Sequence, residues 1–320
     1  MTQVNKGYIM ALLSALFLST TSVFIRYLVT TYDIPPLVLA WWRNVFAIAT
    51  LVPILWVWDR RLLRPALHHL PFLAGFGCIL GFFNGLWALS VTYNGAAVAT
   101  VMVYCSTAYT VILGWKFFGE RLGAAQFGAV LLCLSGCILI SGALDPHAWH
   151  VNVLGIVVGL LTGLCYTGYS LMGRTAAGRG ISPWTTLLYS FCFALLFLSL
   201  TNMTCGVLPG SARSIQDFLW LGDAVAGWLV LVALGAIPTV AGYGFYNVSL
   251  GILNASVANI IVSLEPAFTA FFAYAVLREV MNLEQSAGAL LVLTGVVVIK
   301  VADLRAAPVR FLSRDTERGA

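Results

Sequence analysis

The sequence predicts an all-α polytopic membrane protein in which ten transmembrane helices form two inverted five-helix repeats. Three observations carry this prediction: an apolar composition, ten separate apolar runs and an internal repeat. Hydrophobic residues make up 60% of the 320 positions and charged residues only 9%, and the mean hydropathy is +0.93. Soluble domains are roughly 25% charged. The composition therefore indicates a chain that lies largely within a bilayer.

The apolar runs are each long enough for a helix to cross the hydrocarbon core of a membrane. Charges, Pro or Gly bound them, and most connections between them are short, so neighbouring helices are expected to be antiparallel. The first run is longer than a signal-peptide core, and we interpret it as a retained span. The longest linker, from Asn202 to Ala224, is a candidate for a short interfacial helix. The predicted spans cover about 7 to 29, 35 to 58, 70 to 93, 96 to 117, 122 to 142, 152 to 174, 183 to 203, 226 to 248, 253 to 277 and 283 to 303.

The distribution of Lys and Arg predicts the orientation of these spans. Ten spans place both termini on one side of the membrane. Thirteen of the 17 Lys and Arg residues then fall on that side, three fall on the opposite side, and Arg43 lies within the second span. Cytoplasmic loops are the ones enriched in Lys and Arg. Both termini are therefore expected to be cytoplasmic.

An internal repeat divides the chain into two units. Sliding the sequence by 159 positions aligns Glu120 with Glu279 and Gly136 with Gly295, without a gap between Ser90 and Lys300. The predicted units are residues 1–150, residues 151–303 and a polar cytoplasmic tail at 304–320. Because five spans are an odd number, the second unit enters the membrane from the opposite face. Inverted repeats are typical of secondary transporters, whose substrate site lies near the midplane between the two halves.

Small residues at helical spacing predict close helix packing in two spans. The third span contains GCILGFFNG, with Gly77, Gly81 and Gly85, and the sixth contains GIVVGLLTG, with Gly155, Gly159 and Gly163. Glycine at every fourth position lets two helices approach closely. These are packing features, and they do not select a substrate.

These features together resemble the drug/metabolite transporter superfamily, specifically its EamA-type ten-helix branch. The segments WKFFGERLGAAQFGAVLLCLSGCILI and AYAVLREVMNLEQSAGALLVLTGVVVIK carry the resemblance, which extends from Gly7 to about Val301. It implies efflux of small metabolites, amino acids or drugs across the plasma membrane, here expected to be a bacterial inner membrane. Family carriers commonly have Pro in the fourth and ninth spans, Glu at the end of each, and Gly-rich fifth and tenth spans. The residues that match are Pro266, Glu120, Glu279, Gly136 and Gly295.

The fourth span departs from the family pattern. Thr107 occupies the position equivalent to Pro266, and Ser106 occupies that of Glu265. We therefore expect a helix break, and a gating role for it, only at Pro266 in the ninth span.

Glu265 is the first candidate for a substrate-binding residue. A carboxylate near the middle of a span costs about 2.5 to 3.5 kcal/mol unless it faces a partner, a cavity or a ligand. Glu265 could bind the ammonium group of a substrate or exchange protons. The alternative is that it pairs with Arg43 or a Tyr hydroxyl and only fixes helix packing. Pro266 favours a site role because it frees a backbone carbonyl beside the acid.

Further polar and aromatic side chains within the spans complete the candidate site. Arg43 could attract a carboxylate, or it could serve a structural ion pair. Amide, phenol and indole groups suit a pocket with an apolar body and a few polar anchors. Glu120 and Glu279 end the fourth and ninth spans, and we interpret them as helix-end pairing partners. The substrate-binding candidates besides Glu265 are Asn84, Trp87, Tyr243, Tyr246, Asn247, Tyr109 and Arg43.

The chain lacks the motifs of enzymes and pumps. All four His residues lie in loops, and there is no HExxH, no GxxxxGK[ST] loop and no ATP-binding domain. No enzyme activity, cofactor, metal site or nucleic-acid partner is expected; the expected partners are a small-molecule substrate, the lipid bilayer and, for an antiporter, protons. The leading hypothesis is a secondary exporter of a small amphipathic metabolite, such as an amino acid or organic cation, that works by alternating access. The alternatives are an importer of the same fold and a non-transporting membrane scaffold or receptor.

Overall fold

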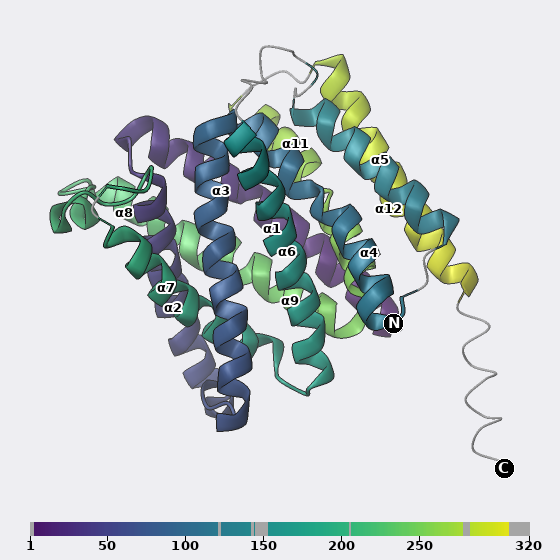
Figure 1. The fold of residues 1–320 in the computed structure, drawn as a ribbon, viewed down its shortest axis with the longest axis horizontal. Helices are drawn as coiled ribbons and strands as arrows, with labels where there is room; N and C mark the ends of the chain where they lie inside the picture. Colours follow the sequence, from purple (N-terminus) through teal and green to yellow (C-terminus); the bar gives the residue numbers. More distant parts are fainter. Residues whose placement is uncertain are drawn as a thin grey trace.

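The protein is an assembly of helices in which the long segments run side by side (Figure 1). The computed structural model describes residues 3–120, 123–141, 144, 153–204, 206–277 and 282–306, and no strand occurs among them. Glu279, the expected unit boundary at 150/151 and residues 307–320 of the expected tail lie outside this range. The all-α part of the sequence prediction is confirmed.

Among the described residues, the first half of the chain forms five α-helices and two short 3-10 helices. The second half forms seven α-helices, one short 3-10 helix and one π-helix. In the first half these are α1 (Gln3–Tyr32), α2 (Pro36–Trp58), η1 (Arg60–Leu63), η2 (Leu67–His69), α3 (Leu70–Tyr104), α4 (Ser106–Phe118) and α5 (Ala124–Ser141). In the second they are α6 (Val153–Gly178), α7 (Pro183–Asn202), η4 (Ile215–Leu219), α8 (Val225–Leu234), η5 (Gly235–Gly242), α9 (Tyr243–Ile252), α10 (Ala255–Val262), α11 (Glu265–Leu277) and α12 (Leu283–Ala306).

By length and composition, seven helices of the described residues are long and apolar enough to cross a membrane. They cover Gln3–Tyr32, Pro36–Trp58, Leu67–Trp87, Val101–Phe118, Leu154–Gly178, Pro183–Asn202 and Val225–Ile252. Three shorter apolar helices, Ala124–Ile140, Ala255–Thr269 and Ser286–Ala302, occupy the places of the remaining predicted spans. The chain is therefore a multi-pass membrane protein. The linker after α7 holds the short helix η4, at the place where an interfacial helix was expected.

The segment α3 folds back on itself although its hydrogen bonding stays helical throughout. A Cβ built at Gly159 of α6 would lie 3.0 Å from both Ser90 Oγ and Met102 Cβ. In a straight helix, twelve residues would separate these two positions by about 18 Å. The chain must therefore reverse between Ser90 and Met102, which agrees with the predicted division into a span ending near 93 and another beginning near 96.

The helix break predicted at Pro266 is confirmed. Helix α10 ends at Val262, and α11 begins at Glu265. Pro266 has no N–H to donate to the Val262 carbonyl, so the α-helical ladder cannot continue through this turn. The expectation that only the ninth span is interrupted is wrong, because α3 ends at Tyr104 and α4 begins at Ser106, although the Cys105 N–H still bonds the Val101 carbonyl at 3.2 Å. Cys105 is the residue equivalent to Leu264 in the internal repeat, so the interruption does not require the proline.

A third interruption, which the sequence analysis did not predict, lies in the eighth span. Eight residues from Gly235 to Gly242 form the π-helix η5 between α8 and α9, and Pro238 lies within it. The Thr239 hydroxyl donates to the Leu234 carbonyl at 2.7 Å, which satisfies one of the acceptors that the altered ladder releases. This distortion sets the direction from which α9 presents Tyr243, its first residue.

Helices α5 and α12 pack along one edge of the molecule (Figure 1). A Cβ at Gly136 of α5 would lie 2.6 Å from the Gly288 carbonyl oxygen of α12, and a Cβ at Gly295 would lie 3.0 Å from the Ala129 carbonyl oxygen. Moving from 129 to 136 on α5 thus means moving from 295 to 288 on α12. The two helices run antiparallel.

Two of the predicted glycine faces also make close contacts. Gly77 and Gly81 of α3 lie against α7, where a Cβ at Gly81 would come within 2.7 Å of the Phe197 ring. Gly159 and Gly163 of α6 lie against the end of α3 around Met102. Gly85, in contrast, has no atom within 4 Å of the position of a Cβ. The packing prediction is confirmed for two glycines in each span.

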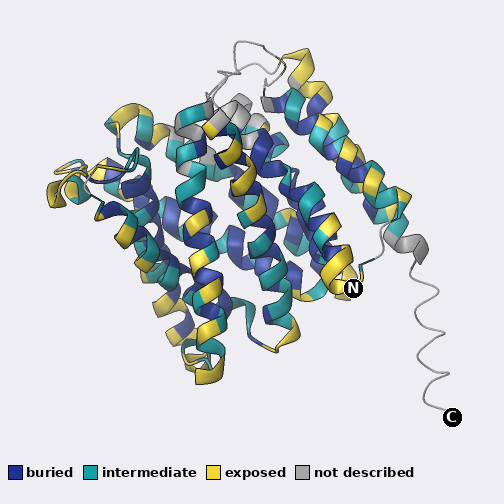
Figure 2. Cartoon of the chain, in the orientation of Figure 1, coloured by how far each residue is buried: buried dark blue, intermediate teal, exposed yellow. Residues whose placement is uncertain are grey.

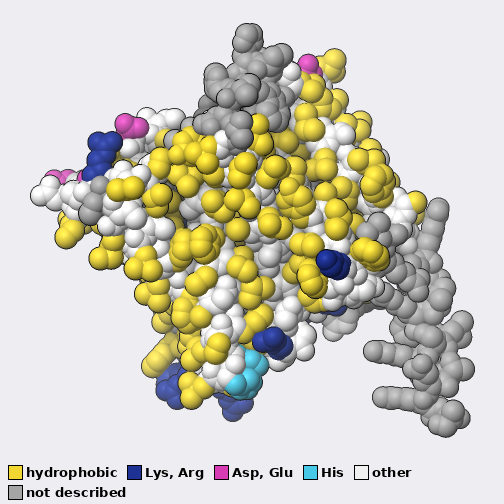
Figure 3. Space-filling view, viewed as in Figure 1, with side chains coloured by type: hydrophobic (Ala, Val, Ile, Leu, Met, Phe, Trp, Pro, Cys, Tyr) yellow, Lys and Arg dark blue, Asp and Glu magenta, His cyan; other side chains and the backbone are white. Residues whose placement is uncertain are grey.

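The surface matches a membrane environment. Buried residues line the faces where helices meet (Figure 2), and hydrophobic side chains cover most of the face shown in Figure 3. On that face the His side chains and most Lys and Arg side chains lie toward the lower end of the molecule in this view, and carboxylates lie toward the upper end, with a further basic side chain beside them at the upper left. The start of α1 and the end of α12 meet, because Lys300 Nζ donates to Asn5 Oδ1 at 3.0 Å and lies 3.6 Å from the centre of the Tyr8 ring.

Candidate functional site

Glu265 lies inside the helix bundle at the break in the ninth span. It is the first residue of α11 and is half-buried. The Tyr104 hydroxyl donates a hydrogen bond to its carboxylate, and Tyr166 and Tyr243 are within electrostatic range. All three tyrosines are buried. The carboxylate therefore faces the protein interior and not the lipid, and the residue as a whole keeps some accessible surface.

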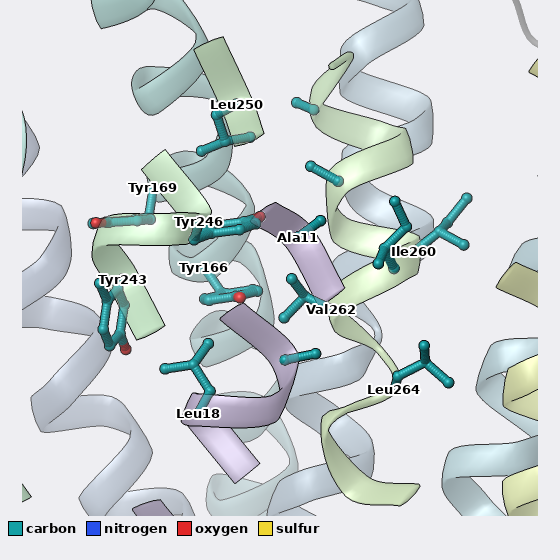
Figure 4. Packing of buried hydrophobic residues seen from close by; sticks show 14 of the residues in the cluster. Ala11, Leu18, Tyr166, Tyr169, Tyr243, Tyr246, Leu250, Ile260, Val262 and Leu264 are labelled. Carbon is teal, nitrogen blue, oxygen red and sulfur yellow. The ribbon is translucent and has the colours of Figure 1, made fainter. Parts of the chain in front are cut away.

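The tyrosines near Glu265 belong to a stack between α6 and α9. The rings of Tyr166 and Tyr169 are almost parallel to that of Tyr246, with interplanar angles of 4° and 9° and ring centres 6.0 and 6.3 Å away (Figure 4). Tyr243 meets Tyr169 edge-on at 5.6 Å. Parallel and edge-on pairs are the favoured arrangements of aromatic rings. The stack forms a rigid wall, and Tyr166 and Tyr243 are the members whose electrostatic neighbours include Glu265.

Tyr246 and Asn247, two predicted site residues, direct their polar atoms toward α6. The Tyr246 hydroxyl is 2.7 Å from Ser170 Oγ, and Asn247 exchanges hydrogen bonds with the Tyr169 hydroxyl at 3.1 and 3.3 Å. Both side chains are buried. These polar atoms therefore already have protein partners on α6. Their hydrogen bonds hold α9 against α6 and so fix the position of the tyrosine stack.

Arg43 and Asn84, two further predicted residues, contact each other between α2 and α3. Arg43 Nη2 donates to Asn84 Oδ1 at 2.5 Å, and both side chains are buried. Arg43 also interacts electrostatically with Tyr243. Among the described residues it forms no ion pair with Glu265, so the structural alternative in which these two charges neutralise each other is not realised. The Tyr hydroxyl in that alternative is present, as Tyr104.

The remaining predicted residues, Trp87 and Tyr109, are less closely connected to the acid. Trp87 is half-buried and packs against the hydrophobic core. Tyr109 is half-buried on α4, and its ring lies 3.4 Å from the position of a Cβ at Gly163. The structure thus joins Arg43 to Asn84 by a hydrogen bond and places Tyr243 within electrostatic range of both Arg43 and Glu265. Tyr246 and Asn247 bond to α6, and Trp87 and Tyr109 make packing contacts.

A buried polar seam that the sequence analysis missed joins α4, α6 and α10. The fully buried Asn259 donates from Nδ2 to Thr110 Oγ1 at 3.0 Å and to Ser170 Oγ at 3.4 Å. Its Oδ1 accepts from Thr107, whose hydroxyl is also 3.1 Å from Ser263 Oγ. Thr107 stands where the repeat has Pro266, and its hydroxyl supplies a link that proline could not. The seam connects the fourth and ninth spans, the two that are interrupted, by hydrogen bonds between their side chains.

Glu120 pairs with the end of a helix, as expected. Its carboxylate accepts from the Ala255 backbone N–H at 3.1 Å and from the Ser256 hydroxyl, at the first turn of α10. Asn254, the residue before α10, makes no side-chain capping bond, so the carboxylate of Glu120, 135 residues before Ala255, takes that role. Acidic groups at a helix N-terminus satisfy unpaired N–H groups and favour the helix dipole. Glu120 therefore ties the end of α4 to the start of α10.

The described residues offer no metal centre. No group of three or more His, Cys, Asp or Glu side chains within them could hold a metal ion. The chemistry available near Glu265 consists of a carboxylate, a guanidinium group, phenols and amides. Such groups bind and orient a small charged molecule.

Comparisons with known proteins agree with this architecture. The model of the EamA-like transporter family matches residues 5–142 and again residues 153–301. A protein of Escherichia coli (strain K12), described as a probable amino-acid metabolite efflux pump, is 24% identical over 92% of this chain and 94% of its own. An uncharacterized transporter of Archaeoglobus fulgidus is 25% identical over 92% of this chain and 98% of its own. A solved crystal structure superposes with a TM-score of 0.74 over 93% of this chain and 98% of its own; at 16% identity this shows the fold alone. The chain belongs to the EamA-like transporter family, and it is a membrane transporter.

Proposed function

We propose that this protein is a secondary transporter that exports a small amphipathic metabolite, such as an amino acid or organic cation, by alternating access around Glu265. The observation that carries the proposal is the position of this acid. It is partly accessible and lies beside a broken helix, and its neighbours are interior tyrosines. Ionisable residues inside membrane bundles mark substrate or ion pathways.

The site would bind the cargo through a few polar anchors on an apolar wall. The Glu265 carboxylate takes an ammonium group, and the face of Tyr243 contributes a cation–π contact. Arg43 and Asn84 form a second polar point near Tyr243. Tyr246 and Asn247 keep the wall rigid, while Trp87 and Tyr109 supply apolar surface.

The two units are expected to be residues 1–150 and 151–303, each with five helices and inverted relative to the other. This arrangement accounts for a pair of equivalent contacts between α5 and α12. The pair Gly136 and Gly288 corresponds through the repeat to Gly295 and Ala129, and both pairs are in contact. Equivalent helices related by an axis in the membrane plane must run antiparallel, as α5 and α12 do. The family model also matches twice. These observations support a repeat of ten spans in which each half can rock against the other.

The proposed orientation places both termini in the cytoplasm, and the membrane is the plasma membrane, in bacteria the inner membrane. The meeting of Lys300 and Asn5 supports an even number of crossings. The thirteen Lys and Arg residues assigned to the side of the termini support the cytoplasmic assignment.

Efflux is the favoured direction because two relatives, from Escherichia coli and Salmonella typhimurium, are described as amino-acid metabolite efflux pumps. An importer of the same fold remains the second candidate, since the inverted symmetry treats the two directions alike. A non-transporting scaffold or receptor is the third candidate, and it would need a partner-binding surface outside the membrane.

Flux measurements in proteoliposomes test the proposal. Wild-type protein is expected to carry labelled amino acids or amines, and Glu265→Gln is expected to lose most of this flux together with its pH dependence. Glu284→Gln is the matched control, because it is the same substitution at an exposed residue in the first turn of α12. Full and equally pH-dependent flux in Glu265→Gln would remove the acid from the mechanism. Flux that runs only toward the face of the protein that is cytoplasmic in the cell would favour the importer.

A further inference from the structure

Two unpaired nitrogen donors lie next to each other in the interior. Six buried polar side-chain atoms have no hydrogen-bond partner within the described part of the chain. Four of them are oxygens, and the two nitrogens are Arg43 Nε and Asn84 Nδ2. They flank the 2.5 Å bond between Arg43 Nη2 and Asn84 Oδ1. Since Arg can only donate, this bond fixes the amide so that Nδ2 points its hydrogens elsewhere.

The burial of Arg43 makes these free donors costly. Arg43 is 7% exposed and Asn84 is 2% exposed. A buried cation is normally paired with an acidic side chain, and unpaired buried donors lose the hydrogen bonds that they make to water. Arg43 has no such carboxylate among the described residues. A positive charge with two free N–H donors therefore favours an anion with two acceptor oxygens, and the planar guanidinium group matches a carboxylate in shape and charge.

We propose that Arg43 and Asn84 form a carboxylate-binding subsite, so that the cargo is a zwitterion and not a simple organic cation. This inference rests on the proposed transport function and narrows its substrate class. The carboxylate of the cargo accepts from Arg43 Nε and Asn84 Nδ2, and its ammonium group lies at Glu265. Tyr243 interacts electrostatically with both Arg43 and Glu265. The apolar part and the α-carbon of an amino acid would therefore lie beside Tyr243.

Matched ligand pairs test this subsite directly. L-Leucine and 3-methylbutylamine have the same apolar body and ammonium group, and so do L-phenylalanine and 2-phenylethylamine; only the amino acids carry the carboxylate. Thermal-shift titrations of purified full-length protein are expected to show tighter binding of at least one amino acid than of its amine, by tenfold or more. Loss of one charge-assisted hydrogen bond corresponds to about this factor.

Variants separate binding from folding. Arg43→Gln is expected to remove the difference between amino acid and amine. Asn84→Asp is expected to keep the protein folded, because the new carboxylate pairs with Arg43, and to abolish the preference for the amino acid by occupying the site. Arg61→Gln is the control, since this arginine is exposed in η1. If Arg43→Gln does not fold, Asn84→Asp alone gives the answer.

The possible outcomes are distinct. The inference is overturned if no amino acid binds better than its amine, or if Asn84→Asp retains the preference. Glu265-dependent flux of both amines and amino acids at similar rates would also overturn it, and the proposed transport function would stand. Absence of Glu265-dependent flux for every compound would instead refute the transport function itself.

Discussion

The tight contact between α5 and α12 gives a quantitative prediction about Gly136. A Cβ at this position would lie 2.6 Å from the Gly288 carbonyl oxygen and 2.9 Å from the Val292 backbone nitrogen. Both are backbone atoms, so no side-chain rotation can relieve the clash, and the helices must separate. Overpacking of this kind typically costs about 1 to 3 kcal/mol.

Gly128 is a matched control on the same helix, because no atom lies within 4 Å of the position of its Cβ. Alanine at either position gains about 1 kcal/mol of helix propensity. This gain cancels when Gly136→Ala and Gly128→Ala are compared with each other. The packing cost of about 1 to 3 kcal/mol should then appear alone as the difference in stability.

Thermal unfolding in detergent measures this difference. For a chain of this size, about 2 °C of melting temperature corresponds to each kcal/mol, so Gly136→Ala is expected to melt about 2 to 6 °C below Gly128→Ala. Gly288→Ala should behave like Gly136→Ala, since its Cβ would lie 2.7 Å from the Gly136 carbonyl oxygen. Equal melting temperatures for Gly136→Ala and Gly128→Ala would refute the close packing of these equivalent helices.

Three further changes have defined outcomes. Pro266→Ala restores an N–H that can bond the Val262 carbonyl, so the protein should become more stable while flux slows; faster flux would show that the break does not assist gating. Glu120→Ala removes two hydrogen bonds at the first turn of α10 and should lower unfolding stability by about 1 to 2 kcal/mol, whereas Glu284→Ala should have little effect. Backbone N–H groups of Arg213 and Ser214 hold the pKa of Asp217 below its usual value, so its contribution to stability is present at neutral pH and is lost as pH falls below about 4 and through this lowered pKa. The melting temperatures of wild type and Asp217→Asn should therefore converge on acidification, and a gap that widens would contradict this sign.

The fold was predictable to the extent that it depends on apolar length and repetition. Composition predicted the helices, the 159-residue offset predicts that α5 and α12 are equivalent, and Pro266 located one break. The break at Cys105 was not predictable from residue type, because no proline causes it. The π-helix carried a signal, Pro238 inside the apolar run GAIPTVAG, but a proline alone does not show which ladder replaces the α-helical one.

The residue types of the candidate site were predictable from the sequence, but the directions in which the side chains point were less so. Glu265, Arg43 and Asn84 stood out as polar groups within spans. Tyr246 and Asn247 follow Tyr243 by three and four residues, about one helical turn, yet they turn their polar atoms toward α6, and sequence spacing alone could not distinguish these roles. 

The polar seam has a signal in the sequence, which is a stripe of polar residues along the ninth span. Ser256, Asn259 and Ser263 recur three and four residues apart, on one face of the ninth span. A polar stripe in an apolar helix predicts partners on a neighbouring helix, and Thr107 and Thr110 of α4 are those partners.

The most direct test of the transport account is whether the surroundings of Glu265 open to both sides of the membrane. Phe268, one turn along α11, is half-buried and lies on the same face as Glu265. With Phe268→Cys as the sole cysteine, a membrane-impermeant maleimide should label the protein in right-side-out and in inverted vesicles, and cargo should change the ratio of the two rates. Labelling from one side only, unchanged by any cargo, would contradict alternating access.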